Sequence, residues 1–551
     1  MKIVFASILV ISFFAFQSCM KGESVDLVIH NARIHTMNEA DEVFDAIAIK
    51  DGKIVEVGPE RQILNKYSAD EYIDAGLKDV YPGLTDGHGH LLSYARMQLG
   101  VNLFGCKSYD EMLMRIKKYQ AKHNRSFIIG SGWDQSLWDD GNELPTNEKL
   151  DSVFPNVPIA LIRIDGHAML VNDKLLKKSK VIETVNASPE KYVGGDFIYD
   201  EDGKPTGMVI DNAMNPIMAM IPEYPKKELT KTMKGIQAEL FSYGITGVHD
   251  AGLTSNDRKT IEKWVDQRVL KLNIYGMLLP DEGNIAFAEK NGIYENKNLY
   301  IRSFKILGDG AVGSRGALMK EEYADRHGHY GHLTTSISEM ERIAALCERI
   351  GYQMNTHAIG DSTNRIILEM YAKVYARNNN YRWRIEHAQH IDPNDFDLLA
   401  ASGAYPSVQP THATTDQRWA IERLGAERMH GSYAYKTILE RCGILVIGTD
   451  FPVEYTDPFR TIHSATNRKT TENFPMNGFL PEEAITLKQC LKGMTIWAAF
   501  GAFQENKLGS LEKGKDATLV IFKDAIVERA AFKNNFANMV FVKGDKVYSV
   551  D

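Results

Sequence analysis

Eight short, mostly apolar segments recur along the central part of the chain, and helical stretches separate them. Such alternation predicts strands that are buried on both faces, because a strand inside a parallel sheet need not alternate apolar and polar positions. Strand and helix alternating eight times predict an α/β fold with a (β/α)8 TIM barrel over residues 81–495. The predicted strands lie within residues 80–87, 244–252, 271–280, 301–310, 352–361, 381–389, 404–413 and 444–453.

Both ends of the chain show a different pattern of short strands and tight turns. Residues 26–58 alternate around an Asp51-Gly52 turn, and residues 516–550 do so around a Gly544-Asp545 turn. Neither end has enough strands to cover its own apolar face. The two ends are therefore expected to pair into one small β-sandwich, built from residues 24–80 and 496–551.

The interval from Leu91 to Tyr243 is several times longer than a strand-to-strand crossover needs. It contains strand-like pieces of its own at residues 127–134 and 159–172. We expect an insertion after the first barrel strand, at about residues 105–230. Its place above the barrel mouth suits a lid or one wall of a substrate pocket.

The first residues form a separate unit with a basic Lys2, an apolar run and Gln17-Ser18-Cys19. The run is about 14 residues long, shorter than the roughly 20 of a spanning helix and typical of a secretory signal. A small residue before Cys19 predicts a lipoprotein-type signal segment at residues 1–19 and export to the periplasm or cell envelope. The membrane contact would then be the lipid anchor alone. Simple secretion and a retained apolar anchor are the alternatives.

Composition and net charge exclude some classes of partner but do not indicate a function. The chain has 551 residues and a formal net charge of −8, with acidic and basic residues interspersed. It offers no broad basic surface of the kind that neutralises phosphates, so nucleic acid is not an expected partner. The scattered Cys106, Cys347, Cys442 and Cys490 form no CxxC motif and are read as buried thiols.

Candidate chemistry gathers at the carboxyl ends of the predicted strands, where barrels place their active sites. His88 and His90 end the first segment, and residues two apart on a strand point the same way. Imidazole nitrogen and carboxylate oxygen are the ligands that catalytic divalent metals use. For each residue taken singly, a hydrogen-bonded core or loop residue is the favoured interpretation. The recurrence at several strand ends favours a metal site. The candidate ligands are His88, His90, Lys305, His357, His387 and Asp450.

Lys305 needs a separate account, because a protonated amine would be repelled by metal cations. A lysine carboxylated by CO2 becomes an anionic oxygen ligand that can bridge two metals. The alternative is an ordinary ion pair with Asp309 or Asp450.

Two other motifs are not assigned to the active site. The GxGxxG string at residues 308–313 lacks the long helix of a nucleotide site. His327, His329 and His332 are expected in a solvated loop.

Together these residues resemble the amidohydrolase superfamily, and longer strings are similar to its YtcJ-like branch, which includes N-substituted formamide deformylases. The resemblance runs from about Asp26 to Val550. The strings that carry it are GSGWDQSLW, LIRIDGHAMLVN, DGAVGSRGAL, RIEHAQ, SVQPTHATTDQRWAIERLG, GTDFPVE and KLGSLEKGKDATLVI.

The resemblance implies a metal-dependent hydrolase with one or two divalent ions, usually zinc, acting on a small-molecule amide-like substrate. His88 and His90 would bind one ion and His357 and His387 the second, with carboxylated Lys305 as the bridge. Asp450 would be both ligand and proton carrier in cleaving a C–N bond. A homodimer is left open.

Supporting residues are assigned more loosely. We expect substrate contacts from six residues within the shared strings: Trp133, Arg163, His167, Asp309, Arg315 and His412. For Trp133 and Arg163 the alternative is packing of the insertion against the barrel, and for His249 no role is assigned.

The same metal site would also serve a cyclic amidase, a deaminase or an esterase. A metal-poor ligand-binding lipoprotein is the alternative from another class. The complete set of six candidate ligands argues against the binding protein, because capture of a ligand does not require them.

Overall fold

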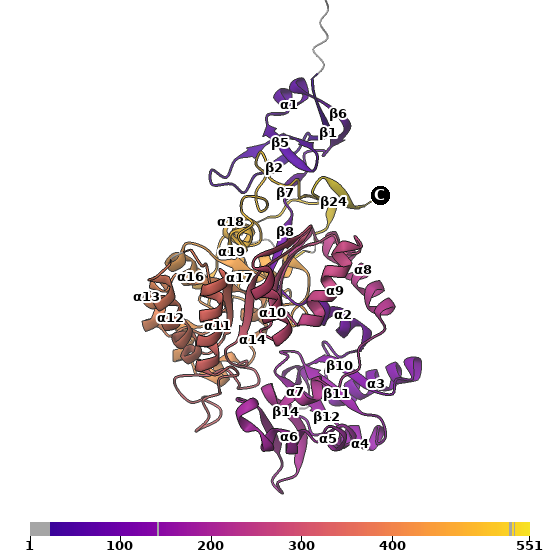
Figure 1. Cartoon of the computed structure of the whole chain (residues 1–551), viewed down its shortest axis with the longest axis vertical. Helices are drawn as coiled ribbons and strands as arrows, with labels where there is room; N and C mark the ends of the chain where they lie inside the picture. Colours follow the sequence, from indigo (N-terminus) through magenta and orange to yellow (C-terminus); the bar gives the residue numbers. More distant parts are fainter. Residues whose placement is uncertain (1–21, 140–142, 379, 528–531, 534, 551) are drawn as a thin grey trace, which may run out of the picture.

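The computed structural model describes residues 22–139, 143–378, 380–527, 532–533 and 535–550. The expected signal segment with Cys19 lies outside these residues. The chain is arranged along one long axis (Figure 1), with the two chain ends at one end, the barrel in the middle and the inserted residues at the other end.

The central sheet is a parallel barrel, which confirms the α/β barrel predicted from the sequence. Its strand order is β22-β21-β20-β19-β18-β16-β15-β8, and neighbours on this path are parallel. The interiors of these strands are almost entirely buried, as expected for strands covered on both faces. The strands are β8 (Leu84–Gly89), β15 (Ile245–Leu253), β16 (Asn273–Leu278), β18 (Leu299–Leu307), β19 (Gln353–Ala358), β20 (Arg384–His387), β21 (Tyr405–Val408) and β22 (Val446–Ile447).

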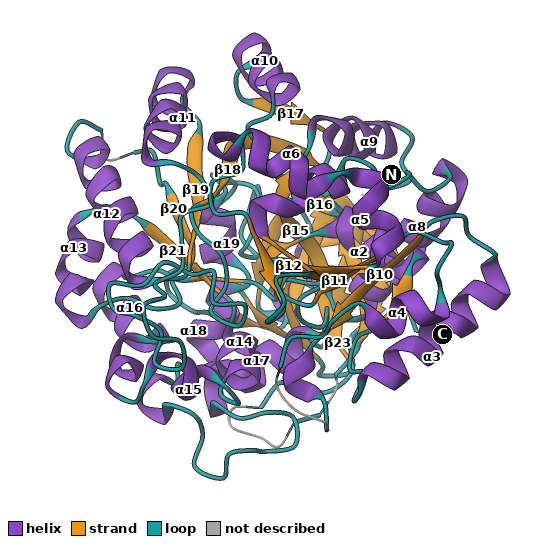
Figure 2. Ribbon diagram, turned by 90° about the horizontal axis from the view of Figure 1, so that it is seen from below, coloured by secondary structure: helices purple, strands orange, loops and turns teal. Residues whose placement is uncertain are grey.

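Helices surround the barrel strands (Figure 2) and bury one apolar stripe each. In α11 (Ile337–Ile350) the buried residues include Met340, Ile343, Ala344 and Cys347, which share one helix face. The Ser336 side chain caps this helix by accepting a hydrogen bond from the Glu339 N–H. The other principal helices are α8 (Lys226–Ser242), α9 (Ser255–Asp266), α10 (Glu282–Asn291), α12 (Asp361–Tyr375), α13 (Phe396–Ala401), α16 (Tyr435–Cys442), α17 (Pro458–Asn467), α18 (Leu487–Gly493) and α19 (Ile496–Gly501).

The seam between the first and eighth barrel strands depends on glycine. A Cβ on Gly87 would lie 2.5 Å from Val446 Cγ1, and one on Gly448 would lie 2.3 Å from the His88 nitrogen. Beyond this close approach the Asp450 N–H donates to the His88 carbonyl oxygen at 2.7 Å. The glycines in the Asp-Gly-His and Gly-Thr-Asp motifs therefore let the two strands meet.

The predicted first barrel strand is in fact two strands, which corrects the sequence prediction. β7 (Asp79–Pro82) pairs with the sandwich strands, and β8 begins after Gly83. The chain passes from one sheet into the other at Gly83. A Cβ at this position would come within 2.2 Å of Thr246 Oγ1, so only glycine fits so close to Thr246. In the sequence the two strands form one continuous apolar run, so the change of sheet cannot be predicted from it.

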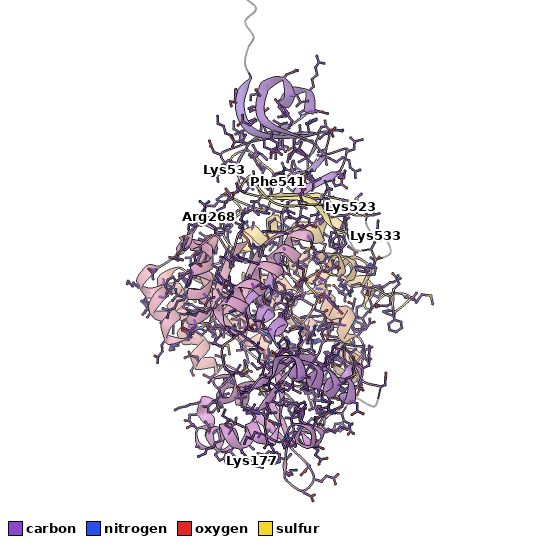
Figure 3. All side chains as sticks on the ribbon, turned by 90° about the vertical axis from the view of Figure 1, so that its right-hand side faces the viewer. Lys53, Lys177, Arg268, Lys523, Lys533 and Phe541 are labelled. Atoms are coloured by element: carbon purple, nitrogen blue, oxygen red, sulfur yellow. The ribbon has the colours of Figure 1, made fainter. Side chains whose placement is uncertain are left out.

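Two sheets share one core at the chain ends. The sheet of order β5-β4-β1-β6 comes from the N-terminal part alone, and the sheet of order β25-β24-β23-β7-β2-β3 takes strands from both ends. Their shared core includes Ile29 and Ile47 from the N-terminal part and Leu519 and Phe541 from the C-terminal part. Figure 3 labels Phe541 in this region and Lys177 at the far end of the molecule. The strands are β1 (Glu23–His30), β2 (Arg33–His35), β3 (Val43–Phe44), β4 (Ala46–Lys50), β5 (Lys53–Gly58), β6 (Tyr67–Asp74), β23 (Leu519–Phe522), β24 (Ala537–Val542) and β25 (Asp545–Ser549); α1 (Glu60–Lys66) joins β5 to β6.

The long interval after β8 folds around a third sheet of order β13-β14-β12-β11-β10-β9. α2 (Leu91–Leu99) precedes this sheet and α8 follows it. The remaining elements are β9 (Val101–Asn102), α3 (Tyr109–His123), β10 (Ile128–Trp133), α4 (Glu148–Val153), β11 (Ile159–Arg163), β12 (Ala168–Val171), α5 (Asp173–Ser179), α6 (Val181–Ala187), β13 (Asp196–Tyr199), β14 (Pro205–Ile210), η3 (Asp211–Met214) and α7 (Asn215–Met218). We refer to residues 101–218 as the insertion.

Within the described part of the chain, no helix is both long and apolar enough to span a bilayer.

Candidate metal centre

The candidate ligands converge at the carboxyl ends of the barrel strands. His88 belongs to β8, His90 follows that strand, His387 is the last residue of β20, and Asp450 follows β22. His387 and Asp450 have positive φ angles of 74° and 65°, a left-handed conformation that is uncommon for residues other than glycine. Backbone strain of this kind concentrates at functional sites, where the surrounding structure enforces it.

A buried ion pair orients His88. Its Nδ1 lies 2.6 Å from Glu386 Oε2, and Glu386 also pairs with the guanidinium of Arg384. Burial opposes ionisation of Glu386, but the charges of Arg384 and His88 hold the pKa of this carboxyl well below its usual range. An ionised carboxylate only accepts hydrogen bonds, so His88 Nδ1 carries the proton and Nε2 is left for the cavity.

Two groups of side chains at this point have the donor atoms and spacing of a metal site. His88, His90 and Asp450 form one group and His387, His412 and Asp450 the other, with the ligand atoms of each group within 4.8 Å of one another. Asp450 Oδ1 lies 3.1 Å from His90 Nε2 and 3.6 Å from His88 Nε2. Asp450 is therefore shared by both groups.

Several of these atoms are buried without a hydrogen-bond partner among the described residues: Asp450 Oδ1, His387 Nδ1 and His412 Nε2. Unsatisfied buried polar atoms are costly and call for an explanation. Burial, followed by the charges of neighbouring residues, keeps the pKa of His387 well below its usual range. The imidazole is thus neutral, which is the form that binds a metal, and the donor set of imidazole and carboxylate fits a divalent ion.

Lys305, on β18, is buried at the same place and its Nζ lies 3.4 Å from His88 Nε2. Burial lowers the pKa of its amine to about 8, against the opposing influence of Glu386 and Asp450. Neither the ion pair with Asp309 nor that with Asp450 considered above is among the salt bridges of the described residues, so the lysine is near the ligands without being neutralised by one carboxylate.

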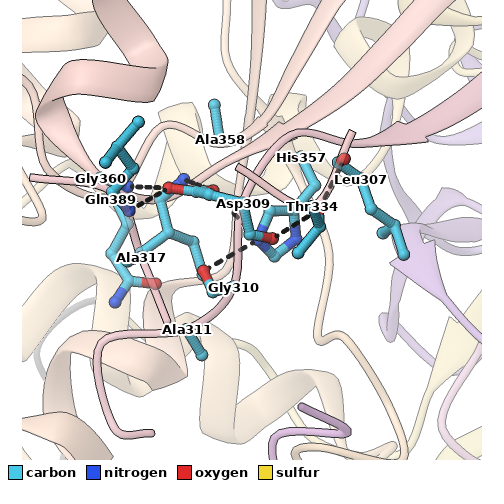
Figure 4. A network of polar contacts seen from close by, with 12 residues as sticks. Leu307, Asp309, Gly310, Ala311, Ala317, Thr334, His357, Ala358, Gly360 and Gln389 are labelled. Atoms are coloured by element: carbon cyan, nitrogen blue, oxygen red, sulfur yellow. Dashed lines mark hydrogen bonds and ion pairs between the residues drawn. The ribbon is translucent and has the colours of Figure 1, made fainter. Parts of the chain in front are cut away.

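His357 lies beside the centre in a different environment. Its ring is 4.5 Å from that of His387, but its Nε2 is 3.3 Å from the Gly310 carbonyl oxygen. Asp309 accepts hydrogen bonds from the N–H groups of Leu318, Ile359 and Gly360 and its Oδ1 is 3.5 Å from His357 Nε2 (Figure 4). His357 is not a member of either ligand group formed by described residues, and Asp309 organises the loop around it.

A cavity of about 1770 Å³ opens onto these ligands between the barrel and the insertion. Of the six residues expected to contact substrate, Arg163, His167 and His412 line it. His412 Nε2 is 3.6 Å from Asp450 Oδ2, so it belongs with the candidate ligands. The Arg163 guanidinium is buried and already bonded to Gln135, Asp134 and Asp165.

The other three residues expected to contact substrate, Trp133, Asp309 and Arg315, are not among those that line this cavity. Trp133 is fully buried in a core of the insertion and donates its Nε1–H to the Leu161 carbonyl oxygen at 2.8 Å. The guanidinium of Arg315 forms an ion pair with Asp325 at 2.8 Å.

Some residues of the site were not predicted from the sequence. The alternation of Arg384 and Glu386 on one face of β20 was the signal for the pair that supports His88. Arg384 also donates to His249 Nδ1 at 2.9 Å, which places His249 in the barrel interior. Asp211 accepts from both His167 and His332, at 2.6 and 2.7 Å. No motif in the sequence links Asp211, His167 and His332, and the sequence predicts His332 in a solvated loop.

Comparison with known proteins gives one consistent family. The model described as "Amidohydrolase family" matches residues 71–548. The chain is 31% identical over 518 residues to Protein LONG AFTER FAR-RED 3 of Arabidopsis thaliana, with 91% of this chain and 87% of that protein covered. It is 26% identical over 498 residues to the Putative amidohydrolase YtcJ of Bacillus subtilis, covering 89% and 93% of the two chains.

Two further likenesses agree with this result. An N-substituted formamide deformylase of Arthrobacter pascens is 24% identical over 522 residues, covering 90% of this chain and 93% of that protein. The crystal structure of an uncharacterized metal-dependent hydrolase from Pyrococcus furiosus has a TM-score of 0.69 and 26% identity, covering 92% of this chain and all 100% of that chain. The family match spans most of the sequence and the resemblance drawn from its motifs is confirmed: the chain is a member of the amidohydrolase family.

Proposed function

We propose that this protein is a metal-dependent hydrolase that cleaves an amide-like C–N bond of a small molecule. Membership of the amidohydrolase family supports hydrolysis, and the similarity to a protein named N-substituted formamide deformylase favours the C–N bond. The observation that carries the proposal is the set of buried, unpartnered ligand atoms at one point, on Asp450, His387 and His412, among the described residues.

His88, His90, His387, His412 and Asp450 would hold the metal, with Lys305 and His357 adjacent. A divalent ion held there lowers the pKa of water towards about 7 and polarises a carbonyl group. Glu386 fixes the ring of His88 and makes it a better electron-pair donor, because a carboxylate on Nδ1 strengthens the Nε2 lone pair. Arg384 in turn keeps Glu386 ionised.

Asp450 is suited to carry the proton. Its carboxylate lies at the carboxyl end of the barrel, facing the cavity, and the adjacent His88 and His90 hold its pKa below the usual range despite burial. An ionised carboxylate accepts the proton of the attacking water and then delivers it to the leaving nitrogen. That delivery matters because an amine leaves poorly as an anion.

Lys305 is proposed to be carboxylated. Reaction with CO2 requires the neutral amine, and burial shifts the pKa of Lys305 to about 8, so about a tenth of the amine is neutral at pH 7. Carboxylation would turn a cation 3.4 Å from His88 Nε2 into an anion. Mass spectrometry of the intact protein under bicarbonate would show the added carboxyl group.

The test is a hydrolysis screen of N-formyl and N-acyl amines with zinc-loaded protein, using Asp450→Asn as the inactive comparison. Release of the amine by wild type and not by the variant supports amide hydrolysis. Hydrolysis confined to cyclic amides or esters would overturn the proposed bond while keeping the metal site. No hydrolysis of any compound by a protein of full metal content would overturn the proposed function.

A further inference from the structure

We propose that the insertion, together with Met97 of α2, forms an apolar acyl-binding roof, so that the enzyme selects amides carrying a long aliphatic or aromatic group. This inference rests on the proposed amide hydrolysis and names its substrate class. We use "roof" for the wall of the cavity made by Met97, Ile129, Ile162, Ile164, Met214 and Met218.

The roof begins as one face of the insertion sheet. Ile128 of β10 and Leu161 of β11 are fully buried in the insertion core, whereas the next residues, Ile129 and Ile162, are only partly buried and line the cavity. Side chains alternate between the two faces of a strand. One face of the sheet packs onto the insertion core. On the other face Ile129 and Ile162 pack at the edge of a second buried cluster that includes Val171 and Val209, and their remaining surface lines the cavity.

Methionines extend the roof beyond the sheet. Met97 on α2, Met214 and Met218 line the same cavity, and Met218 is 44% exposed although it is a large apolar residue. Methionine has several rotatable bonds and a polarisable sulfur, so it adapts to apolar ligands of varied shape. Exposed apolar surface inside a cavity indicates an apolar occupant more strongly than scattered surface residues do.

The opposite wall is mixed, because Trp419 and Phe474 line it together with ionisable residues. Asp416, Arg418 and Glu454 line it from the barrel side. With the amide at the metal ligands, an attached aliphatic chain that lies along the roof contacts isoleucine and methionine side chains and leaves the ionisable groups of the opposite wall solvated. The cavity volume of about 1770 Å³ exceeds the roughly 300–1,000 Å³ typical of small-ligand pockets, so room remains beyond the reacting bond.

Polar links from the barrel loops hold the roof over the centre. Asn212 Nδ2–H donates to the Thr334 carbonyl oxygen at 2.7 Å, and His332 Nε2 is 2.7 Å from Asp211 Oδ2. On another side the rings of Phe104 and Tyr455 meet edge to face with centroids 4.8 Å apart. The roof is thus fixed in place by contacts outside its apolar face, so its side chains can be changed without removing these links.

The experiment compares one amine acylated with butanoyl, hexanoyl or decanoyl groups. For wild type we expect kcat/KM to rise by at least about 100-fold from butanoyl to decanoyl, a conservative figure because each buried methylene adds several-fold. The double variant Met97→Gln, Met218→Gln keeps side-chain length while placing amides on the roof. Its kcat/KM should fall at least about 10-fold for the decanoyl amide and little for the butanoyl amide.

Met476→Gln is the matched control, because Met476 is 82% exposed and does not line the cavity. It should behave as wild type with every chain length. Equal kcat/KM for short and long acyl groups in wild type, or an equal loss for both in the double variant, would overturn the roof and leave amide hydrolysis intact.

Calorimetric titration with decanoate and butanoate separates this inference from the proposed function. Both zinc-loaded and chelator-treated protein should bind decanoate more tightly than butanoate, and the double variant should lose that preference. If no amide is hydrolysed but the preference for decanoate persists, the roof stands and the proposed reaction fails. Equal binding of the two acids by wild type would contradict the roof whatever the activity.

Discussion

His88 Nδ1 and Glu386 Oε2 lie 2.6 Å apart, with both side chains buried at the carboxyl end of the barrel. The carboxylate fixes which ring nitrogen carries the proton and turns Nε2 towards Asp450. The two residues come from β8 and β20, so the pair forms only when the barrel closes. The orientation of a candidate ligand is therefore a consequence of the fold.

Glu386→Gln should weaken zinc binding by about 10- to 100-fold, the usual cost of losing a carboxylate behind a metal-bound histidine. Competition with a chromogenic chelator measures the zinc Kd directly, and circular dichroism checks that the variant is folded. Glu422→Gln, at an exposed carboxylate, is the control and should keep the wild-type Kd. An unchanged Kd in Glu386→Gln would show that the pair does not support a metal ligand.

Asp450→Asn should lower kcat by about 100- to 10,000-fold, the range for loss of a general acid and base. Most of the metal should remain, since the histidine ligands are untouched. Steady-state kinetics together with elemental analysis of the same sample make the comparison. Asp397→Asn changes an exposed aspartate and should be active. Full activity in Asp450→Asn would remove this residue from the mechanism.

Gly87→Ala should destabilise the barrel by about 1–3 kcal/mol through overpacking of the seam. The new Cβ would lie 2.5 Å from Val446 Cγ1 and 2.7 Å from the Ile447 carbonyl oxygen. Urea unfolding midpoints measure the loss. Gly235→Ala in α8 meets nothing within 4 Å and should instead stabilise by about 0.5–1 kcal/mol, since glycine is unfavourable inside a helix. Equal effects of the two changes would contradict the close approach of β8 and β22.

Glu56 provides a pH-dependent contribution to stability in the sandwich. Hydrogen bonds from Lys66 and Tyr67 lower the pKa of its carboxyl to about 2. A folded-state pKa below the unfolded value stabilises the protein above about pH 4.3, and this contribution disappears as pH falls towards about 2. Because Lys66 is 42% exposed, solvent limits the contribution to about 1 kcal/mol at pH 7.

Glu56→Gln should accordingly lower the free energy of unfolding by about 1 kcal/mol at pH 7 and by less at pH 3. Urea titrations of wild type and variant at both pH values give the two differences. A difference that is the same at pH 3 and pH 7 would mean that the ion pair does not stabilise the sandwich.

The sequence was sufficient for the barrel because its strands are buried on both faces and appear as apolar runs. It was also sufficient to bring His88, His90, His387 and Asp450 to one end, since each follows or ends a strand. It did not reveal the change of sheet at Gly83, because an apolar run looks the same in either sheet.

The position of a residue on a strand does not determine which neighbours its side chain contacts. His357 ends β19 as expected, yet its Nε2 faces the Gly310 carbonyl oxygen at 3.3 Å. Trp133 also belongs to a shared string, yet it is buried in the insertion core. His412 shows the reverse case: its place past a strand predicts a substrate contact, and its Nε2 lies 3.6 Å from Asp450 Oδ2, among the candidate ligands.

The central claim is that His88, His90, His387, His412 and Asp450 surround a divalent metal. Crystals grown with zinc and bicarbonate and measured on either side of the zinc absorption edge test it most directly. We predict an anomalous difference peak between the imidazole nitrogens and Asp450, within bonding distance of at least three of these side chains. Diffraction with no such peak at this point, from protein that is folded and exposed to zinc, would contradict the account.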